Sequence, residues 1–216
     1  MSNLERLLPD LRARFPETEI VLVDGGSRDG TIEIARRVPD VTALVSPRGR
    51  ATQMNAGARA AHGRVLLFLH ADTWLPDGAL AAVGDALADP AVVGGRFDVR
   101  FDSSRPVLSM IAFFMNLRSR WSGISTGDQA IFVRRDVFDS LGGFAAIPLM
   151  EDIELTRRLK RRGRVAALRA RVTTAARKWE GEGALRTMVL MWALRFLYVC
   201  GVPPARLHRW YYRRAP

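Results

Sequence analysis

The feature that most constrains the fold is an apolar run, residues 65–69, which changes abruptly to the polar residues His70 and Asp72. A run of this kind, Val-Leu-Leu-Phe-Leu, is typical of a strand buried on both faces, as in a parallel sheet. Side chains two residues apart in an extended chain share a face, so His70 and Asp72 are expected to point the same way. A divalent cation held by one carboxylate and by substrate phosphates fits this place. The alternative is that Asp72 or Thr73 only caps a following helix.

An earlier apolar run also leads into a polar turn. Residues 19–24 predict a short strand, the Gly-rich segment 25–31 predicts a turn, and a helix is expected from there to Pro39. In parallel sheets such a turn lies at the ligand edge, where its backbone N–H groups favour an anion. Asp24 is then placed to accept hydrogen bonds from a base or a ribose, unless it only forms an Asx-turn without a ligand.

The same order of strand, turn and helix occurs a third time. Residues 41–45 predict a strand, and Arg48 and Arg50 flank a glycine at the start of an Ala-rich helix, as a diphosphate site requires. Right-handed crossovers place all these turns at one edge of the sheet. The pattern therefore predicts an α/β protein with a central, mostly parallel sheet flanked by helices.

Composition narrows the class of protein. The chain has 216 residues, 48% of them hydrophobic and 25% charged, which suits one soluble domain. The single Cys200 excludes an intramolecular disulfide framework and favours the cytoplasm. The formal net charge of +11 attracts phosphates of any kind. No nucleic-acid reading motif accompanies this charge, so we expect no nucleic-acid partner.

Three segments of the second half leave alternatives open. Residues 105–121 predict an apolar helix that lies either in the core or at a membrane surface. Residues 184–199 are apolar almost all round, which indicates packing against the core, a second subunit or lipid. Residues 206–214 interleave arginine with aromatic residues, as interfacial anchors and solvated tails both do. The expected location is therefore the cytoplasm, and the alternative is the cytoplasm with contact at the inner face of the membrane.

Carboxylates in the second half are candidates for acid–base chemistry. Asp128 and Gln129 precede a predicted strand at residues 130–133, and the Asp128 carboxylate is suited to orienting an acceptor hydroxyl. Glu151 and Asp152 open a helix, where the macrodipole stabilises negative charge. A deprotonated carboxylate there suffices as a general base. Beyond a pair of short strands predicted at 165–168 and 172–175, the cations around residue 177 are placed to neutralise a leaving diphosphate.

Several of these segments, taken together, resemble the family 2 glycosyltransferases. The segments 23–31, 48–57 and 68–73 resemble the nucleotide-sugar half, and 127–135, 141–144 and 151–158 resemble the acceptor half. The two consecutive glycines after Asp24, His70 and the Gly-Asp-Gln at 127–129 resemble a short bacterial subgroup associated with radical-enzyme and arsenosugar gene clusters. The resemblance implies a single GT-A domain, with residues 1–100 as the nucleotide-sugar half, 101–180 as the acceptor half and 181–216 as a helical extension.

The same resemblance implies an inverting transfer from a nucleoside-diphosphate sugar, with a UDP-sugar favoured, to a hydroxyl acceptor. It implies Mn²⁺ or Mg²⁺ as cofactor. Carried over residue by residue, the implied roles are nucleotide contacts for Asp24, Gly25, Ser27, Asp29, Arg48 and Asn55, metal binding for Asp72 and His70, catalysis for Asp152 as base with Glu151, and acceptor or diphosphate contacts for Asp128, Gln129, Arg177, Lys178 and Trp179.

Two departures from the family pattern carry consequences. Members usually begin with a strand ending in an Asn-Glu pair, whereas this chain opens on a helix; either translation starts further upstream or the site is weakened. A sheet edge left open tends to aggregate or to be covered by another chain. The usual metal motif also has aspartate where this chain has His70, and imidazole suits Mn²⁺ better than Mg²⁺. The rival interpretations are an inactive nucleotide- or sugar-binding module of the same fold and, less favoured, a nucleic-acid binder.

Overall fold

A computed structural model of the chain describes residues 3–213, without the side chains of Lys178, Glu182 and Arg213. Arg214, in the basic and aromatic tail, lies outside the described residues. The elements follow in the order α1 (Asn3–Arg14), β1 (Ile20–Asp24), α2 (Thr31–Arg36), β2 (Val41–Val45), α3 (Arg50–Ala60), β3 (Val65–Phe68), β4 (Thr73–Trp74), α4 (Ala79–Ala88), β5 (Val92–Phe101), α5 (Pro106–Ser122), η1 (Gly127–Gln129), β6 (Ile131–Arg134), α6 (Arg135–Ser140), α7 (Glu151–Leu159), β7 (Arg164–Thr174), α8 (Arg177–Glu182), α9 (Ala184–Val199) and α10 (Pro204–Arg213).

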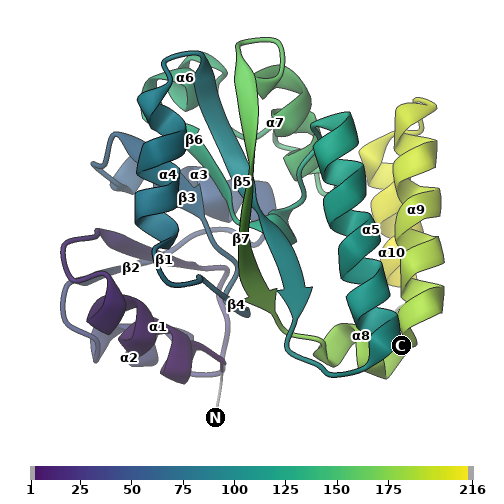
Figure 1. The fold of residues 1–216 in the computed structure, drawn as a ribbon. Coiled ribbons are helices and arrows are strands. Elements are labelled where there is room, and N and C mark those ends of the chain that lie inside the picture. The colour runs from purple at the N-terminus through teal and green to yellow at the C-terminus, as the bar shows by residue number, and fades with distance from the viewer. Residues whose placement is uncertain (1–2, 214–216) are drawn as a thin grey trace.

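The strands form two sheets. β1 and β2 pair in parallel, and the other strands have the order β3-β6-β5-β7-β4. Helices flank this central sheet on both sides, so the predicted α/β class is confirmed (Figure 1). The pairing is mixed: β5 and β7 are parallel, whereas β3–β6, β5–β6 and β4–β7 are antiparallel. β4 follows β3 in the chain after a short turn, but it pairs with β7 at the opposite end of the strand order.

Two local predictions differ from the structure. The strand pair expected at 165–168 and 172–175 is one strand, β7, which bends at a register shift opposite Phe97 and Asp98. β3 was expected to be buried on both faces, but it is the outer strand of the five-stranded sheet and Val65 is exposed. The side of β3 away from β6 pairs with no described strand.

Close approach at the middle of the sheet explains two consecutive glycines in β5. A Cβ on Gly94 would lie 2.5 Å from the carbonyl oxygen of Phe132, and one on Gly95 would lie 2.5 Å from that of Ala166. Only glycine lets the neighbouring strands pack this closely. The core continues from this point through the buried side chains of Phe97 and Phe132.

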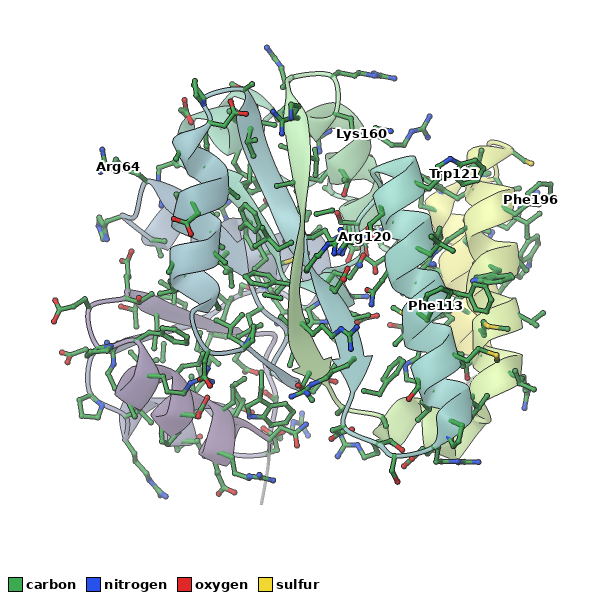
Figure 2. The ribbon with its side chains drawn as sticks, in the orientation of Figure 1. Arg64, Phe113, Arg120, Trp121, Lys160 and Phe196 are labelled. Atoms are coloured by element: carbon green, nitrogen blue, oxygen red, sulfur yellow. The ribbon has the colours of Figure 1, made fainter. Side chains whose placement is uncertain are left out.

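The C-terminal helices form a layer on one side of the sheet. α5, α9 and α10 lie next to one another there, and α1 and α2 accompany β1 and β2 at the other end of the molecule (Figure 1). The helix predicted at 184–199 is confirmed as α9. The tail is also helical: Leu207 of α10 is fully buried in a cluster with Met150, Ile153 and Leu194. Phe113 and Trp121 of α5 and Phe196 of α9 instead point away from the sheet (Figure 2).

Within residues 3–213, no helix is long and apolar enough to cross a bilayer.

Candidate functional site

The backbone is strained on both sides of a cluster of carboxylates. Among the described residues, the positive φ angles outside glycine belong to Asp40, Ala130 and Met150. Ala130 (φ 48°) directly follows η1, and Met150 (φ 71°) directly precedes α7. Each such conformation costs about 1–3 kcal/mol, and such residues cluster at functional sites. The fold therefore holds Asp128 and Glu151 in place at the expense of local strain.

The first two residues of α7 have different surroundings. Asp152 is half-buried, and its Oδ2 accepts a hydrogen bond from the backbone N–H of Gly127 at 2.8 Å. Glu151 is fully buried, with Oε1 3.3 Å from Nε of Arg50 but without hydrogen-bond geometry. Burial and the charge of Asp152 raise the pKa of Glu151. Asp152 is thus the carboxylate that a substrate can reach, and Glu151 lies behind it.

His70 links Arg50 to Asp128. Its Nε2 lies 2.9 Å from Nη2 of Arg50, and its Nδ1 lies 3.4 Å from Oδ1 of Asp128. Burial opposes ionisation of Asp128, but the hydrogen bond and charge of His70 prevail and lower the pKa of Asp128 to about 2. Both ring nitrogens of His70, which was predicted to bind metal, therefore face charged side chains.

Two arginines that sequence reasoning did not assign to the site lie near these carboxylates. Arg118 of α5 and Arg195 of α9 both interact electrostatically with Asp152. Burial and the charge of Arg195 lower the pKa of Arg118 to about 10. Nε and Nη2 of Arg118 are buried and have no hydrogen-bond partner among the described residues. Unsatisfied donors on a buried cation are suited to an anionic ligand. The signal in the sequence was an arginine within each of two apolar helices.

The polar groups of the turn after β1 form hydrogen bonds within the turn itself. Asp24 is buried, and its carboxylate accepts hydrogen bonds from Gly26 N at 2.9 Å, from Ser27 N at 2.8 Å and from the Ser27 hydroxyl. Burial opposes ionisation, but these bonds outweigh it and lower the pKa of Asp24. Asp29 is exposed and accepts a 2.6 Å bond from Thr31 Oγ1. The Asx-turn, which was the alternative to a nucleotide contact, is therefore present, and the Asp24 carboxylate is bonded within it.

Gly25, which was predicted to contact nucleotide, lies close to α3. A Cβ there would lie 3.1 Å from Oε1 of Gln53 on α3. The side chain of Gln53 in turn donates to the carbonyl oxygen of Val23 at 3.1 Å. The turn and the start of α3 are thus held together as one wall.

The start of α3 separates the two arginines that were predicted to bind a diphosphate together. Arg48 is exposed and makes no hydrogen bond or ion pair with the described residues. Arg50 instead turns to Glu151 and His70. Asn55, predicted to contact nucleotide, has its amide committed elsewhere: Nδ2 donates to the carbonyl oxygen of Phe144 at 2.8 Å, and Oδ1 accepts from the N–H of Phe144 at 2.9 Å.

The metal motif lies in a turn rather than on an extended strand. β3 ends at Phe68, and the N–H of Thr73 donates to the carbonyl oxygen of His70 at 3.0 Å. His70 and Asp72 therefore do not share a strand face as predicted. The half-buried Asp72 carboxylate has only a long contact, 3.5 Å, with Thr73 Oγ1. No group of three metal-ligating side chains occurs among the described residues. A single free carboxylate fits a cation held mainly by substrate oxygens.

The predicted diphosphate cations follow directly on β7. Ala175 N donates to the carbonyl oxygen of Asp72 at 3.0 Å, which brings the start of α8 to the metal motif. Arg177 is exposed, and the side chain of Lys178 lies outside the described residues. Trp179 packs on Phe101, with ring centroids 5.2 Å apart.

Gln129 is fully buried and closes η1. Its Oε1 accepts from the backbone N–H of Thr126 at 3.2 Å, in a capping box. Nε2 of Gln129, a residue predicted to contact the acceptor, has no hydrogen-bond partner among the described residues, and Asp128 faces His70.

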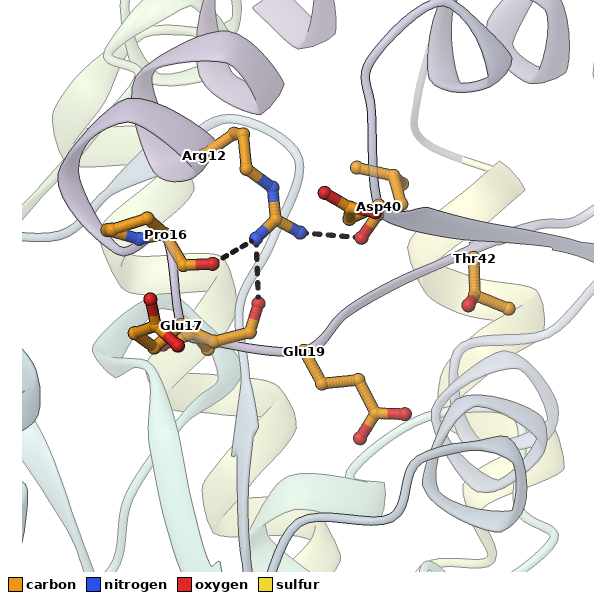
Figure 3. A pocket seen from close by; sticks show the side chains of 8 residues that line it. Arg12, Pro16, Glu17, Glu19, Asp40 and Thr42 are labelled. Atoms are coloured by element: carbon orange, nitrogen blue, oxygen red, sulfur yellow. Dashed lines mark hydrogen bonds between the residues drawn. The ribbon is translucent and has the colours of Figure 1, made fainter.

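Two hollows in the surface lie away from the carboxylates. One, of about 510 Å³, lies between α1, β1 and β2. There Arg12 donates to the carbonyl oxygens of Pro16 at 2.8 Å, Thr18 at 3.2 Å and Asp40 at 2.5 Å (Figure 3). Because its donors bind the chain itself, this hollow indicates a structural contact rather than a ligand site.

The chain matches the model of one protein family, and its fold is similar to that of several solved structures. The model of the family described as "Glycosyl transferase family 2" matches residues 2–148. Glycosyltransferase AglE from Haloferax volcanii is 28% identical over 160 residues, which cover 66% of this chain and 51% of AglE. The chain thus spans about half the length of this curated relative. The family match ends before Glu151, so the roles of Glu151 and Asp152 do not follow from it.

Solved structures of two further proteins share the fold. The mannosyltransferase PcManGT from Pyrobaculum calidifontis, in complex with GDP-Man and Mn²⁺, aligns with a TM-score of 0.64 and 21% identity, covering 94% of this chain and 62% of that one. TarS (residues 1–349) from S. aureus, in complex with UDP-GlcNAc, aligns with a TM-score of 0.59 and 16% identity, covering 81% of this chain and 56% of that one.

Proposed function

From the premise that the chain belongs to glycosyl transferase family 2 and has the GT-A fold, we propose that it transfers a sugar from a nucleoside-diphosphate sugar to a hydroxyl acceptor, with inversion. The observation that carries the proposal is the position of Asp152, a reachable carboxylate fixed by Gly127. The complexes of PcManGT with GDP-Man and of TarS with UDP-GlcNAc support a nucleotide-sugar donor.

In the proposed reaction Asp152 acts as the base. Its carboxylate takes the proton of the acceptor hydroxyl while that oxygen forms a bond to the anomeric carbon of the donor. The bond from this carbon to the diphosphate oxygen breaks, and the diphosphate leaves with the electron pair. Attack opposite the leaving group inverts the anomeric configuration. Arg118 and Arg195, which lie near Asp152, favour an acceptor that carries negative charge.

On the donor side, exposed arginines at Arg48 and Arg177 are available for the diphosphate. Asp72 would hold a divalent cation, Mn²⁺ or Mg²⁺, which when bound neutralises charge on the departing diphosphate. The Mn²⁺ in the PcManGT complex supports this part of the proposal. We also propose that the chain belongs to the short bacterial subgroup. Its proposed location is the cytoplasm, at the inner face of the membrane.

A second candidate is the inactive binding module. It is favoured by Asp24, whose carboxylate is satisfied within its own turn, and by the unpaired side of β3. The test is to incubate the protein with UDP- and GDP-sugars, Mn²⁺ and a panel of hydroxyl acceptors, and to measure release of the nucleoside diphosphate against a chelated control. We expect metal-dependent release, and NMR of the glycosylated product should show inverted configuration. Binding of donors without release from any of them would favour the binding module, and retained configuration would exclude Asp152 as a simple base.

A further inference from the structure

Two neighbouring helices expose apolar side chains on the face opposite to the core. On α5 these are Met110, Phe113, Phe114, Leu117 and Trp121, and on α9 they are Leu185, Val189, Trp192, Phe196 and Val199. On α9 the spacing is three or four residues throughout, and on α5 it is the same except that Phe113 and Phe114 are adjacent, so each set forms one stripe along its helix. Trp121 is 92% exposed, Phe196 68% and Phe113 61%. These three side chains project outward from adjacent helices (Figure 2). We call the two stripes together the α5/α9 face.

The charge around the α5/α9 face has one sign. The sequences of α5, α9 and α10 contain no aspartate or glutamate, whereas they include the exposed Arg120, Arg186, Arg206 and Arg209. A second copy of the chain would therefore bring positive charge against positive charge, and each copy has a formal net charge of +11. An anionic surface is the complementary partner. Exposed tryptophans on such a face are typical of helices that lie at the membrane interface.

A basic cavity opens beside the same face. It has a volume of about 550 Å³, and Phe113 and Leu117 of the α5 stripe line it together with Arg100, Arg120, Arg169 and Arg171. Asp98 also lines it, but this carboxylate is already paired with Arg96 and Arg120. Arg169 and Arg171 are exposed and make no hydrogen bond or ion pair with the described residues. Free guanidinium groups next to exposed apolar side chains suit a phosphate at the level of lipid headgroups.

We propose that the α5/α9 face docks on an anionic lipid bilayer, with the helices lying in the plane of its surface and the basic cavity taking a lipid phosphate. α5 and α9 also supply Arg118 and Arg195 near Asp152. Docking through these helices therefore brings the carboxylate site close to the membrane surface. This inference deepens the proposed place at the membrane, but lipid binding does not depend on sugar transfer, so lipid docking and the proposed transfer reaction fail or hold separately.

The test is co-sedimentation of the full chain with vesicles of phosphatidylcholine alone or with phosphatidylglycerol added. We expect binding to the anionic vesicles that weakens as salt rises. The triple variant Phe113→Ser/Trp121→Ser/Phe196→Ser should bind at least about tenfold more weakly, because three interfacial anchors are lost. Its control is Val45→Ser. Val45 lies on β2 and is as exposed as Phe196, at 68%, and this variant should bind like wild type.

A second pair of variants tests the charge without touching the apolar stripes. Arg169→Gln/Arg171→Gln should weaken binding by roughly 25-fold, at about fivefold for each basic residue near an anionic surface. Arg36→Gln/Arg37→Gln removes the same charge from two exposed positions, the last residue of α2 and its C-cap, and should weaken binding much less. Equal loss in the two double variants would overturn the cavity as a lipid phosphate site. Absence of binding to anionic vesicles would overturn docking on a membrane. A dimer in sedimentation velocity that the triple variant separates would also overturn it and would assign the α5/α9 face to a second copy.

Discussion

Arg50 of α3 lies 3.3 Å from Glu151 of α7, measured from Nε to Oε1, and this ion pair joins the two halves of the site. Glu151 is only 1% exposed. Burial and the neighbouring Asp152 raise the pKa of Glu151 although Arg50 acts in the opposite direction. The ionised carboxylate is therefore a net burden on the folded state at neutral pH, held there by the rest of the structure.

Glu151→Gln should consequently stabilise the protein at pH 7. A carboxyl whose pKa is raised on folding opposes folding only where it is ionised in the unfolded chain, which begins near its ordinary pKa of about 4.3. The gain in the free energy of unfolding should therefore be present at pH 7 and vanish below about pH 4. Urea unfolding of the variant and wild type across this range measures it. A variant that is less stable than wild type at pH 7 would show that the pair with Arg50 dominates.

The shift at Asp128 has the opposite sign. Its pKa, lowered to about 2, means that its contact with His70 stabilises the fold above the ordinary aspartate pKa of about 3.9 and that this contribution is lost as the pH falls through about 2. Asp128→Asn should thus lower the free energy of unfolding at pH 5, and the difference from wild type should shrink below pH 4. A difference that stays constant down to pH 2.5, at about the same value as at pH 5, would exclude this linkage.

Asn55 offers a test between a structural and a nucleotide-binding role. It holds the backbone of Phe144 with two hydrogen bonds, and Asn116 holds the backbone of Val99 with two bonds of the same kind, at 2.8 and 2.9 Å. We expect Asn55→Ala and Asn116→Ala to lower the free energy of unfolding by similar amounts, about 1–3 kcal/mol each. Calorimetry should find nucleotide affinity unchanged in both. A loss of affinity confined to Asn55→Ala would restore the nucleotide contact implied by the sequence.

The metal role of Asp72 is tested by binding rather than by turnover. If this carboxylate holds a cation on the diphosphate, binding of UDP or GDP should need Mn²⁺ or Mg²⁺ and should be weak with chelator. Asp72→Ala should then bind as weakly in the presence of metal as wild type does without it. Asp85→Ala is the control, since Asp85 is an exposed carboxylate on α4. Equal affinity of wild type with and without metal would remove Asp72 from this role.

The strand–turn–helix order in the first half was predictable because each element is specified locally. Apolar runs bounded by glycine and proline gave the positions of β1, β2 and β3, and α9 was found with its bounds. The geometry of His70 and Asp72 was not predictable in this way. Whether the chain stays extended past residue 68 depends on the pairing of β4 with β7. The union of two predicted strands in β7 depends in the same way on a long partner, β5.

The site shows the same division between local and long-range information. Asp152 and Glu151 could be found from the sequence because a pair of carboxylates opens an otherwise amphipathic helix. Arg118 and Arg195 reach the site from helices whose sequences indicate only burial or an interface, and their approach to Asp152 is set by tertiary packing. Asn55 shares a motif with nucleotide-binding residues, yet its amide is used by Phe144, 89 positions further along the chain.

The decisive prediction concerns Asp152. The substitution Asp152→Asn keeps an oxygen that can accept the 2.8 Å bond from Gly127 N, and asparagine is tolerated at a helix start, so fold and donor affinity should remain. Turnover should fall by roughly 10² to 10⁴, the usual contribution of a positioned base, because the amide cannot take the acceptor proton. Asp136→Asn is the matched control: Asp136 is also the second residue of a helix, α6, but it is exposed and outside the carboxylate cluster. That variant should keep wild-type turnover. Measuring melting temperature, donor affinity and turnover for both separates a base from a helix-start carboxylate, and equal turnover in Asp152→Asn and Asp136→Asn would rule out the mechanism.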